Sequence, residues 1–209
     1  MKILIADDHV VMRKGMIHIL LDEFPHMKVT EASGEVEVMN QVSTELFDVI
    51  LLDVSMPGRG GLDLLKQWTA AGLRTPVIVL SLYSDDQYAL RAIKAGASGY
   101  LGKDSKAVEI LRAVDSVLNG KKYIAPNIAE KLVLQISSHH DRMPHEMLSN
   151  RELQVLQFIG SGNTISEIAE TISLSVNTVS TYRARILEKL ALSNNAELTR
   201  YCIDHKLSA

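Results

Sequence analysis

FDVILLD, Phe47 to Asp53, carries the clearest indication of the fold in this sequence. It is a short, nearly continuous hydrophobic run that ends in a carboxylate, as is typical of a strand covered on both faces in a parallel sheet. PVIVLS, Pro76 to Ser81, repeats the pattern, and segments with helical spacing of apolar residues separate such runs. The alternation predicts an α/β fold with a doubly wound, parallel five-stranded sheet over about the first 120 residues. The five predicted strands are Lys2–Ala6, Met27–Ala32, Phe47–Asp53, Pro76–Ser81 and Ser98–Gly102.

The composition is that of an ordinary globular protein. The chain has 209 residues, a formal net charge of −3, 46% hydrophobic residues and a single cysteine. No apolar run approaches the roughly 20 residues that cross a bilayer, and the N-terminus runs directly into a strand rather than a signal peptide. The one cysteine, Cys202, excludes an internal disulfide and suits a reducing compartment. We therefore expect a cytoplasmic protein with no membrane partner.

The alternation of strands and helices ends near residue 121. Residues 122–147 are predicted to link two domains and to contain a short amphipathic helix at Ile128–Ile136. The polar stretch that follows has no period, and neither cysteines nor an acidic cluster accompany its histidines, His139, His140 and His145. A solvated linker is therefore favoured there over a metal site.

The last part of the chain, residues 148–209, is predicted to be a small all-α domain. Ser149 and Glu152 have the spacing of a capping box at the start of a helix. A short helix, a tight turn and a longer helix at Val176–Leu190 then follow, which is the helix-turn-helix pattern.

Polar side chains stand at the ends of the predicted strands. Asp7 and Asp8 follow the first strand, and Asp53 ends the third. Ser81 ends the fourth strand, and Lys103 follows the fifth. Because the carboxyl ends of the strands in such a sheet meet at one edge, we expect these side chains to share a crevice. Three carboxylates there need a cation, and oxygen ligands without His or Cys indicate a hard ion, Mg²⁺, for which Mn²⁺ can substitute.

Asp53 has the chemistry of a nucleophile. A carboxylate can attack a phosphoryl group to form an acyl phosphate while a metal ion and a lysine stabilise charge on the transferring oxygens. Ser81 is placed to hydrogen-bond a phosphoryl oxygen. Each of these residues alone would be explained as a solvated strand end, but the set together favours a phosphate site.

The motifs ADDH, VILLDVSMPGRGGLDLL, PVIVLS and KAGASGYLGK resemble the receiver domain of two-component response regulators. The resemblance covers residues 1–121 and implies a flavodoxin/CheY-like fold. It implies that Asp53 is the phosphoacceptor, that Ser81 and Tyr100 form the hydroxyl and aromatic switch pair, and that Lys103 is the lysine typical of the family. The implied ligands of Mg²⁺ are Asp7, Asp8, Asp53 and the backbone carbonyl of Ser55.

A second resemblance covers Leu148 to His205, which is similar to the LuxR-type helix-turn-helix of the NarL/FixJ class. In the longer helix Val179, Ile186 and Leu190 are predicted to point inward, and the opposite face carries small polar residues that suit the major groove of DNA. The predicted groove-facing residues are Asn177, Ser180, Thr181 and Ala184. The predicted contacts to the DNA backbone are Thr178, Tyr182, Arg183, Arg185 and Lys189.

These features predict a response regulator transcription factor rather than a turnover enzyme. A sensor histidine kinase would phosphorylate Asp53, and this would control homodimerisation and sequence-specific binding to double-stranded DNA. Three alternatives stay open. A phosphatase with an aspartyl nucleophile is disfavoured because Ser55 stands where such enzymes usually place a second acid. The others are a regulator that works without phosphorylation and a protein-protein scaffold that uses the terminal helices.

Overall fold

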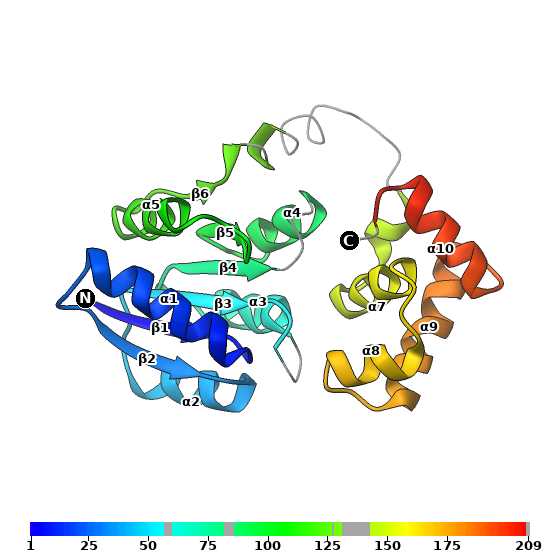
Figure 1. Cartoon of the computed structure of the whole chain (residues 1–209), viewed down its shortest axis with the longest axis horizontal. Coiled ribbons are helices and arrows are strands. Elements are labelled where there is room, and N and C mark those ends of the chain that lie inside the picture. Colours follow the sequence, from blue (N-terminus) through cyan, green and yellow to red (C-terminus); the bar gives the residue numbers. More distant parts are fainter. Residues whose placement is uncertain (57–59, 82–85, 127, 131–142, 208–209) are drawn as a thin grey trace. The chain divides into compact units, whose positions relative to one another are not determined.

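The computed structural model describes residues 1–56, 60–81, 86–126, 128–130 and 143–207 (Figure 1). The chain divides into two compact units, Met1–Ser137 and Ser138–Ala209. No helix in these described ranges is long and apolar enough to cross a bilayer.

The N-terminal unit contains a six-stranded sheet in the order β2-β1-β3-β4-β5-β6, in which every neighbouring pair is parallel. Its strands are β1 (Lys2–Ala6), β2 (Lys28–Ala32), β3 (Val49–Asp53), β4 (Val77–Ser81), β5 (Gly99–Gly102) and β6 (Tyr123–Ile124). All five predicted strands are present, and none begins more than two residues from its predicted start. Every residue of β3 and β4 is buried, which confirms that the apolar runs are covered on both faces.

The sixth strand corrects the prediction of a five-stranded sheet. β6 is only two residues long and pairs with β5, where the Tyr123 N–H donates to the Ser98 carbonyl at 2.9 Å. A two-residue strand is too short to show a period in the sequence, and this one lies in the stretch that was predicted to be a linker.

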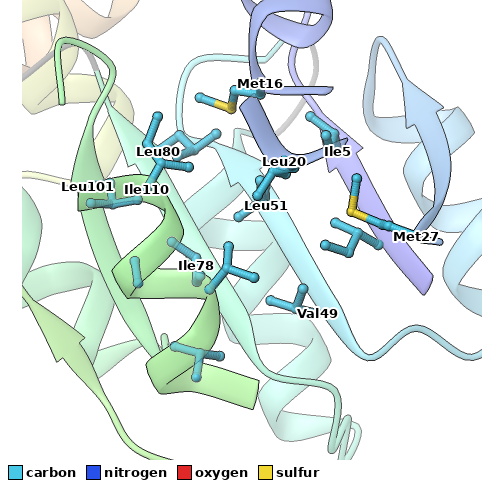
Figure 2. Packing of buried hydrophobic residues seen from close by; sticks show 14 residues of the cluster. Ile5, Met16, Leu20, Met27, Val49, Leu51, Ile78, Leu80, Leu101 and Ile110 are labelled. Atoms are coloured by element: carbon cyan, nitrogen blue, oxygen red, sulfur yellow. The ribbon is translucent and has the colours of Figure 1, made fainter. Parts of the chain in front are cut away.

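Helices cover both faces of the sheet, as predicted for a doubly wound fold. They are α1 (Val10–Glu23), α2 (Glu35–Thr44), α3 (Gly61–Ala70), α4 (Asp86–Lys94) and α5 (Ala107–Leu118). Figure 2 shows how Met16 and Leu20 of α1 and Ile110 of α5 pack with strand residues such as Leu51 and Leu80 in one buried cluster. α2, α3 and α4 bury apolar residues of their own, among them the chain's single tryptophan, Trp68, which is 5% exposed.

The C-terminal unit is helical and contains the predicted helix-turn-helix. Its elements are the 3₁₀ helix η1 (Pro144–Met147) and the α-helices α7 (Asn150–Gly160), α8 (Ile165–Thr171), α9 (Val176–Leu190) and α10 (Asn195–Asp204). Ser149 and Glu152 form the predicted capping box at the start of α7, and a second box begins α8 at Thr164. The predicted inward residues of α9, Val179, Ile186 and Leu190, are all buried.

One histidine of the predicted linker belongs to the folded C-terminal unit. His145 is 3% exposed, and its Nδ1 lies 2.9 Å from the hydroxyl oxygen of Tyr201 in α10. The prediction of a solvated His145 was wrong because its partner is 56 residues away, which no local pattern reveals. His139, His140 and most of the predicted helix at Ile128–Ile136 lie outside the described residues.

Candidate functional site

The carboxyl ends of three strands bring two carboxylates and an ammonium together. Asp7 follows β1, Asp53 ends β3 and Lys103 follows β5. Lys103 Nζ lies 2.6 Å from Asp7 Oδ2 and 3.0 Å from Asp53 Oδ2. The two acidic side chains are 0% exposed and the lysine side chain 2%. These residues therefore form the crevice that the strand ends predicted.

Asp8 and His9 complete the acidic pocket. The Asp8 side chain is 24% exposed, and His9 Nδ1 lies 2.7 Å from Asp8 Oδ1 and 3.1 Å from Asp7 Oδ1. Asp7, Asp8, His9 and Asp53 each offer a ligand atom, and these four atoms lie within 4.8 Å of one another. His9 stands directly after the acidic pair in the sequence and was not among the predicted residues of the site.

Arg13 is a second residue that the sequence analysis missed. Its side chain is mostly buried, and Nη1 donates to the backbone carbonyl of Asp7 at 2.5 Å while Nε donates to Glu31 Oε2 at 3.2 Å. Lys14 also pairs with Glu31, at 2.6 Å. Hydrogen bonds from Lys14 and Arg13 lower the pKa of Glu31, although partial burial opposes them. Arg13 thus ties the loop after β1 to the end of β2 and holds the backbone of the acidic pair.

The remaining predicted residues of the pocket lie on the same strands. Ser81 is buried at the end of β4, and its carbonyl accepts the Lys103 N–H at 2.7 Å. The N–H of Ser55 donates to Asp53 Oδ1 at 3.0 Å. Tyr100 is completely buried within β5. β5 carries the ring of Tyr100 into the interior of the unit.

The pocket makes the charged form of Asp53 costly. Burial raises the pKa of Asp53 from 3.8 to about 6, and the negative charge of Asp7 adds to this rise. The ammonium of Lys103 opposes it without cancelling it. Any further positive charge that reaches the pocket would stabilise the ionised carboxylate of Asp53.

The residues present fit a divalent cation. Asp7 Oδ2, Asp8 Oδ1 and Asp53 Oδ2 are all buried from solvent. Lys103 Nζ lies 2.6 and 3.0 Å from the Asp7 and Asp53 oxygens, and His9 Nδ1 lies 2.7 Å from the Asp8 oxygen. Three carboxylates and one ammonium leave a formal charge of two negatives, and carboxylate oxygens are the ligands that Mg²⁺ prefers.

The helix-turn-helix presents the predicted small polar face to solvent. Asn177, Ser180, Thr181 and Ala184 on α9 are all exposed. Among the predicted contacts to the DNA backbone, Arg185 is exposed and has no side-chain partner among the described residues.

Three other predicted backbone contacts have partners inside the C-terminal unit. Lys189 Nζ lies 2.6 Å from Glu152 Oε2, and Arg183 Nε donates to Asn195 Oδ1. The Thr178 hydroxyl lies 2.7 Å from that of Ser175, the residue that caps α9. Burial alone would raise the pKa of Glu152, but the bond from Lys189 and the cap at the start of α7 lower it. The last predicted contact, Tyr182, is half-buried.

A parallel α/β unit with this acidic pocket, joined to a helix-turn-helix unit, defines the class of two-component response regulators. Two family models match the chain in agreement with that class. Residues 3–115 match the response regulator receiver domain, and residues 146–202 match the bacterial regulatory proteins of the luxR family. The protein belongs to the family of response regulators with a LuxR-type DNA-binding domain, which are transcription regulators rather than turnover enzymes.

The sequence similarity to known response regulators extends over nearly the whole chain. The chain is 36% identical to the response regulator UvrY of Escherichia coli K12 over 206 residues, which cover 98% of this chain and 94% of that protein. It is 33% identical to the response regulator GacA of Pseudomonas aeruginosa, with 98% and 96% of the two chains covered.

The similarity to solved structures also covers both units of the chain. The response regulator ChrA of a heme-sensing two-component system is 30% identical, with a TM-score of 0.50 over 99% of this chain and 98% of that one. RcsB of Salmonella enterica serovar Typhimurium is 25% identical, with a TM-score of 0.59 over 96% and 97%. That RcsB structure is bound to a promoter in the presence of the phosphomimetic BeF3-.

Proposed function

We propose that Asp53 accepts a phosphoryl group from the phosphohistidine of a sensor histidine kinase, and that its phosphorylation controls homodimerisation and DNA binding in the cytoplasm. The observation that carries the proposal is the buried carboxylate of Asp53, 3.0 Å from the Lys103 ammonium and beside the acidic pair. A solvated strand end would need none of this compensation.

The pocket supplies the groups that phosphoryl transfer needs. An oxygen of Asp53 would form the bond to phosphorus while the N–P bond of the phosphohistidine breaks and its electron pair stays on the imidazole. Lys103 Nζ lies beside the attacking carboxylate and would contact one phosphoryl oxygen, and the Ser81 hydroxyl would contact another. Tyr100 would complete the switch pair from its buried position in β5. Hydrolysis of the acyl phosphate would return the protein to its starting state.

Asp7, Asp8, Asp53 and the backbone carbonyl of Ser55 would hold Mg²⁺ or, in its place, Mn²⁺. When bound, the ion offsets the negative charge on the transferring oxygens. Arg13 would position the acidic pair through its bond to the Asp7 carbonyl.

Incubation of the full chain with acetyl phosphate and Mg²⁺ tests the proposal directly. We expect the wild type to gain one phosphoryl group, seen as a retarded band on a phosphate-affinity gel, and Asp53→Asn to gain none. Asp22→Asn is the matched control, since the Asp22 side chain is 70% exposed on α1. Equal labelling of the Asp53 variant and the control would overturn the assignment. Repeated turnover of small phosphate esters would favour the phosphatase alternative.

α9 is the proposed recognition helix. Its exposed face, Asn177, Ser180, Thr181 and Ala184, would meet base edges in the major groove. The flanking contacts to phosphates would come from Thr178, Tyr182, Arg183, Arg185 and Lys189. Arg185 should contribute most of the phosphate attraction, because Arg183 and Lys189 have partners in the free unit.

Gel shifts on genomic fragments, with and without acetyl phosphate and Mg²⁺, test this second half of the proposal. Phosphorylation should tighten DNA binding in the wild type and leave Asp53→Asn unchanged. Arg185→Ala should weaken binding to all fragments about equally, because a phosphate contact carries no base information. Binding that is identical with and without acetyl phosphate would favour regulation without phosphorylation, and no DNA retention at all would favour a scaffold.

A further inference from the structure

His9 has an unusual position for the residue that begins a helix. It stands at the N-cap of α1, yet its side chain makes no hydrogen bond to the amides of that helix. Its Nδ1 lies instead beside the carboxylates of Asp8 and Asp7, at 2.7 and 3.1 Å, and its backbone N–H donates to Asp7 Oδ1 at 2.8 Å. The imidazole therefore faces the pocket that we propose for the divalent cation.

The geometry points to His9 as a nitrogen ligand of that cation, which raises the affinity of the pocket for transition metals such as Mn²⁺ relative to Mg²⁺. This inference rests on the metal site in the proposed function and deepens it. It adds a ligand of different chemistry to the four oxygen donors already assigned.

The spacing of the ligand atoms supports a shared ion. Adjacent ligands of an octahedral ion with bonds of about 2.0–2.1 Å are separated by roughly 2.9 Å. The two distances from His9 Nδ1, 2.7 and 3.1 Å, bracket that value. All four candidate ligand atoms in the pocket lie within 4.8 Å of one another, close enough to surround one small ion.

The chemistry of the donor decides the selectivity. Carboxylate and carbonyl oxygens suit Mg²⁺ and Mn²⁺ alike, whereas an imidazole nitrogen suits first-row transition metals and adds little for Mg²⁺. A pocket with oxygen ligands only would therefore discriminate weakly between Mg²⁺ and Mn²⁺. With His9 in the coordination sphere, loss of the imidazole should cost Mn²⁺ far more than Mg²⁺.

The competing explanation is that His9 only caps the carboxylates when no ion is bound. The same distances of 2.7 and 3.1 Å also suit hydrogen bonds from an imidazole N–H. In that case an incoming ion would have to displace the ring. Removal of the imidazole would then strengthen the binding of Mg²⁺ and Mn²⁺ together.

Mn²⁺ binding to the full chain, followed by the electron paramagnetic resonance signal of free Mn²⁺ in competition with Mg²⁺, separates these explanations. We expect His9→Ala to lower the ratio of Mn²⁺ to Mg²⁺ affinity by roughly tenfold, the lower end of what loss of a metal-site partner costs. His18→Ala is the matched control, because His18 lies on the same helix with a side chain that is 81% exposed. That variant should leave the ratio unchanged. Trp68 fluorescence verifies that each variant remains folded, since Trp68 is buried in the same unit.

Pulsed paramagnetic resonance of the bound Mn²⁺ gives an independent readout. Coupling to an imidazole nitrogen should be present in the wild type and in His18→Ala and absent in His9→Ala. An unchanged ratio, the absence of nitrogen coupling in the wild type, or equal strengthening of both ions in His9→Ala would overturn the inference and leave the proposed function standing. If the wild type binds neither ion, the proposed metal site itself is wrong.

Discussion

Replacement of Asp53 by asparagine should stabilise the N-terminal unit when metal is absent. Burial raises the pKa of Asp53 from 3.8 to about 6, so the ionised carboxylate is less stable in the folded pocket than in the unfolded chain. Because the folded pKa is the higher one, the stability linked to this group is fully present below 3.8 and is lost as the pH rises through about 6. Each unit of pKa corresponds to about 1.36 kcal/mol, so the loss amounts to about 3 kcal/mol at pH 8 and about 1 kcal/mol at pH 4.5.

The amide of Asp53→Asn is neutral and has no charge to bury. In the presence of a chelator, the free energy of unfolding of the variant should therefore exceed that of the wild type by about 3 kcal/mol at pH 8 and about 1 kcal/mol at pH 4.5. Urea unfolding followed by Trp68 fluorescence measures the difference, since Trp68 is the chain's single tryptophan and lies in α3 of the same unit. Saturating Mg²⁺ should reduce the difference in stability between the variant and the wild type, because the ion binds the folded wild type and stabilises it by mass action. Asp22→Asn should change stability by less than about 0.5 kcal/mol, as an exposed substitution does. The prediction is wrong if Asp53→Asn is no more stable than the wild type at pH 8, or if it gains as much stability at pH 4.5 as at pH 8.

The structure supports four further predictions. A Cβ at Gly61 would collide with the backbone carbonyl of Asp53, so Gly61→Ala should lower the stability of the N-terminal unit by about 2 kcal/mol. Gly15→Ala in α1, where a Cβ meets nothing within 4 Å, should raise it by about 0.5–1 kcal/mol in the same urea assay. His145→Phe removes the bond to Tyr201 and should destabilise the C-terminal unit by about 1 kcal/mol, measured by hydrogen exchange of α10. Cys202 is buried and its pKa is raised by that burial to about 12, so it should react with Ellman's reagent only after the C-terminal unit opens; rapid reaction of the native chain would contradict this.

The parts of the fold that the sequence predicted are those with a local signal. The strands β3 and β4 are readable because both faces are covered, which makes nearly every residue from Val49 to Asp53 apolar. The convergence of Asp7, Asp53 and Lys103 followed from topology, because parallel strands bring their carboxyl ends to one edge of the sheet. The capping box at Ser149 was readable because it depends on residues three positions apart.

The parts that were missed depend on partners that are distant along the chain. Arg13 looks like an ordinary helix cation until the fold brings Glu31 beside it. His145 looks solvated until Tyr201 of α10 covers it. The same holds for the cations of α9, because exposure and charge predicted Lys189 as a phosphate contact while its partner Glu152 lies 37 residues earlier. Patterns in sequence identify elements and the edges where they meet, but not these pairings across the fold.

The pairing of Lys189 with Glu152 has a consequence for how DNA would be bound. In the free protein Lys189 forms an ion pair with the carboxylate of Glu152, and this pair would compete with an ion pair between Lys189 and a DNA phosphate. If Lys189 moves to the DNA, one anionic partner replaces another, so this residue should add little net affinity. Glu152 lies in the first turn of α7 and would lose its cationic partner if Lys189 moved to the DNA. The stability of the start of α7 would then depend on whether DNA is bound.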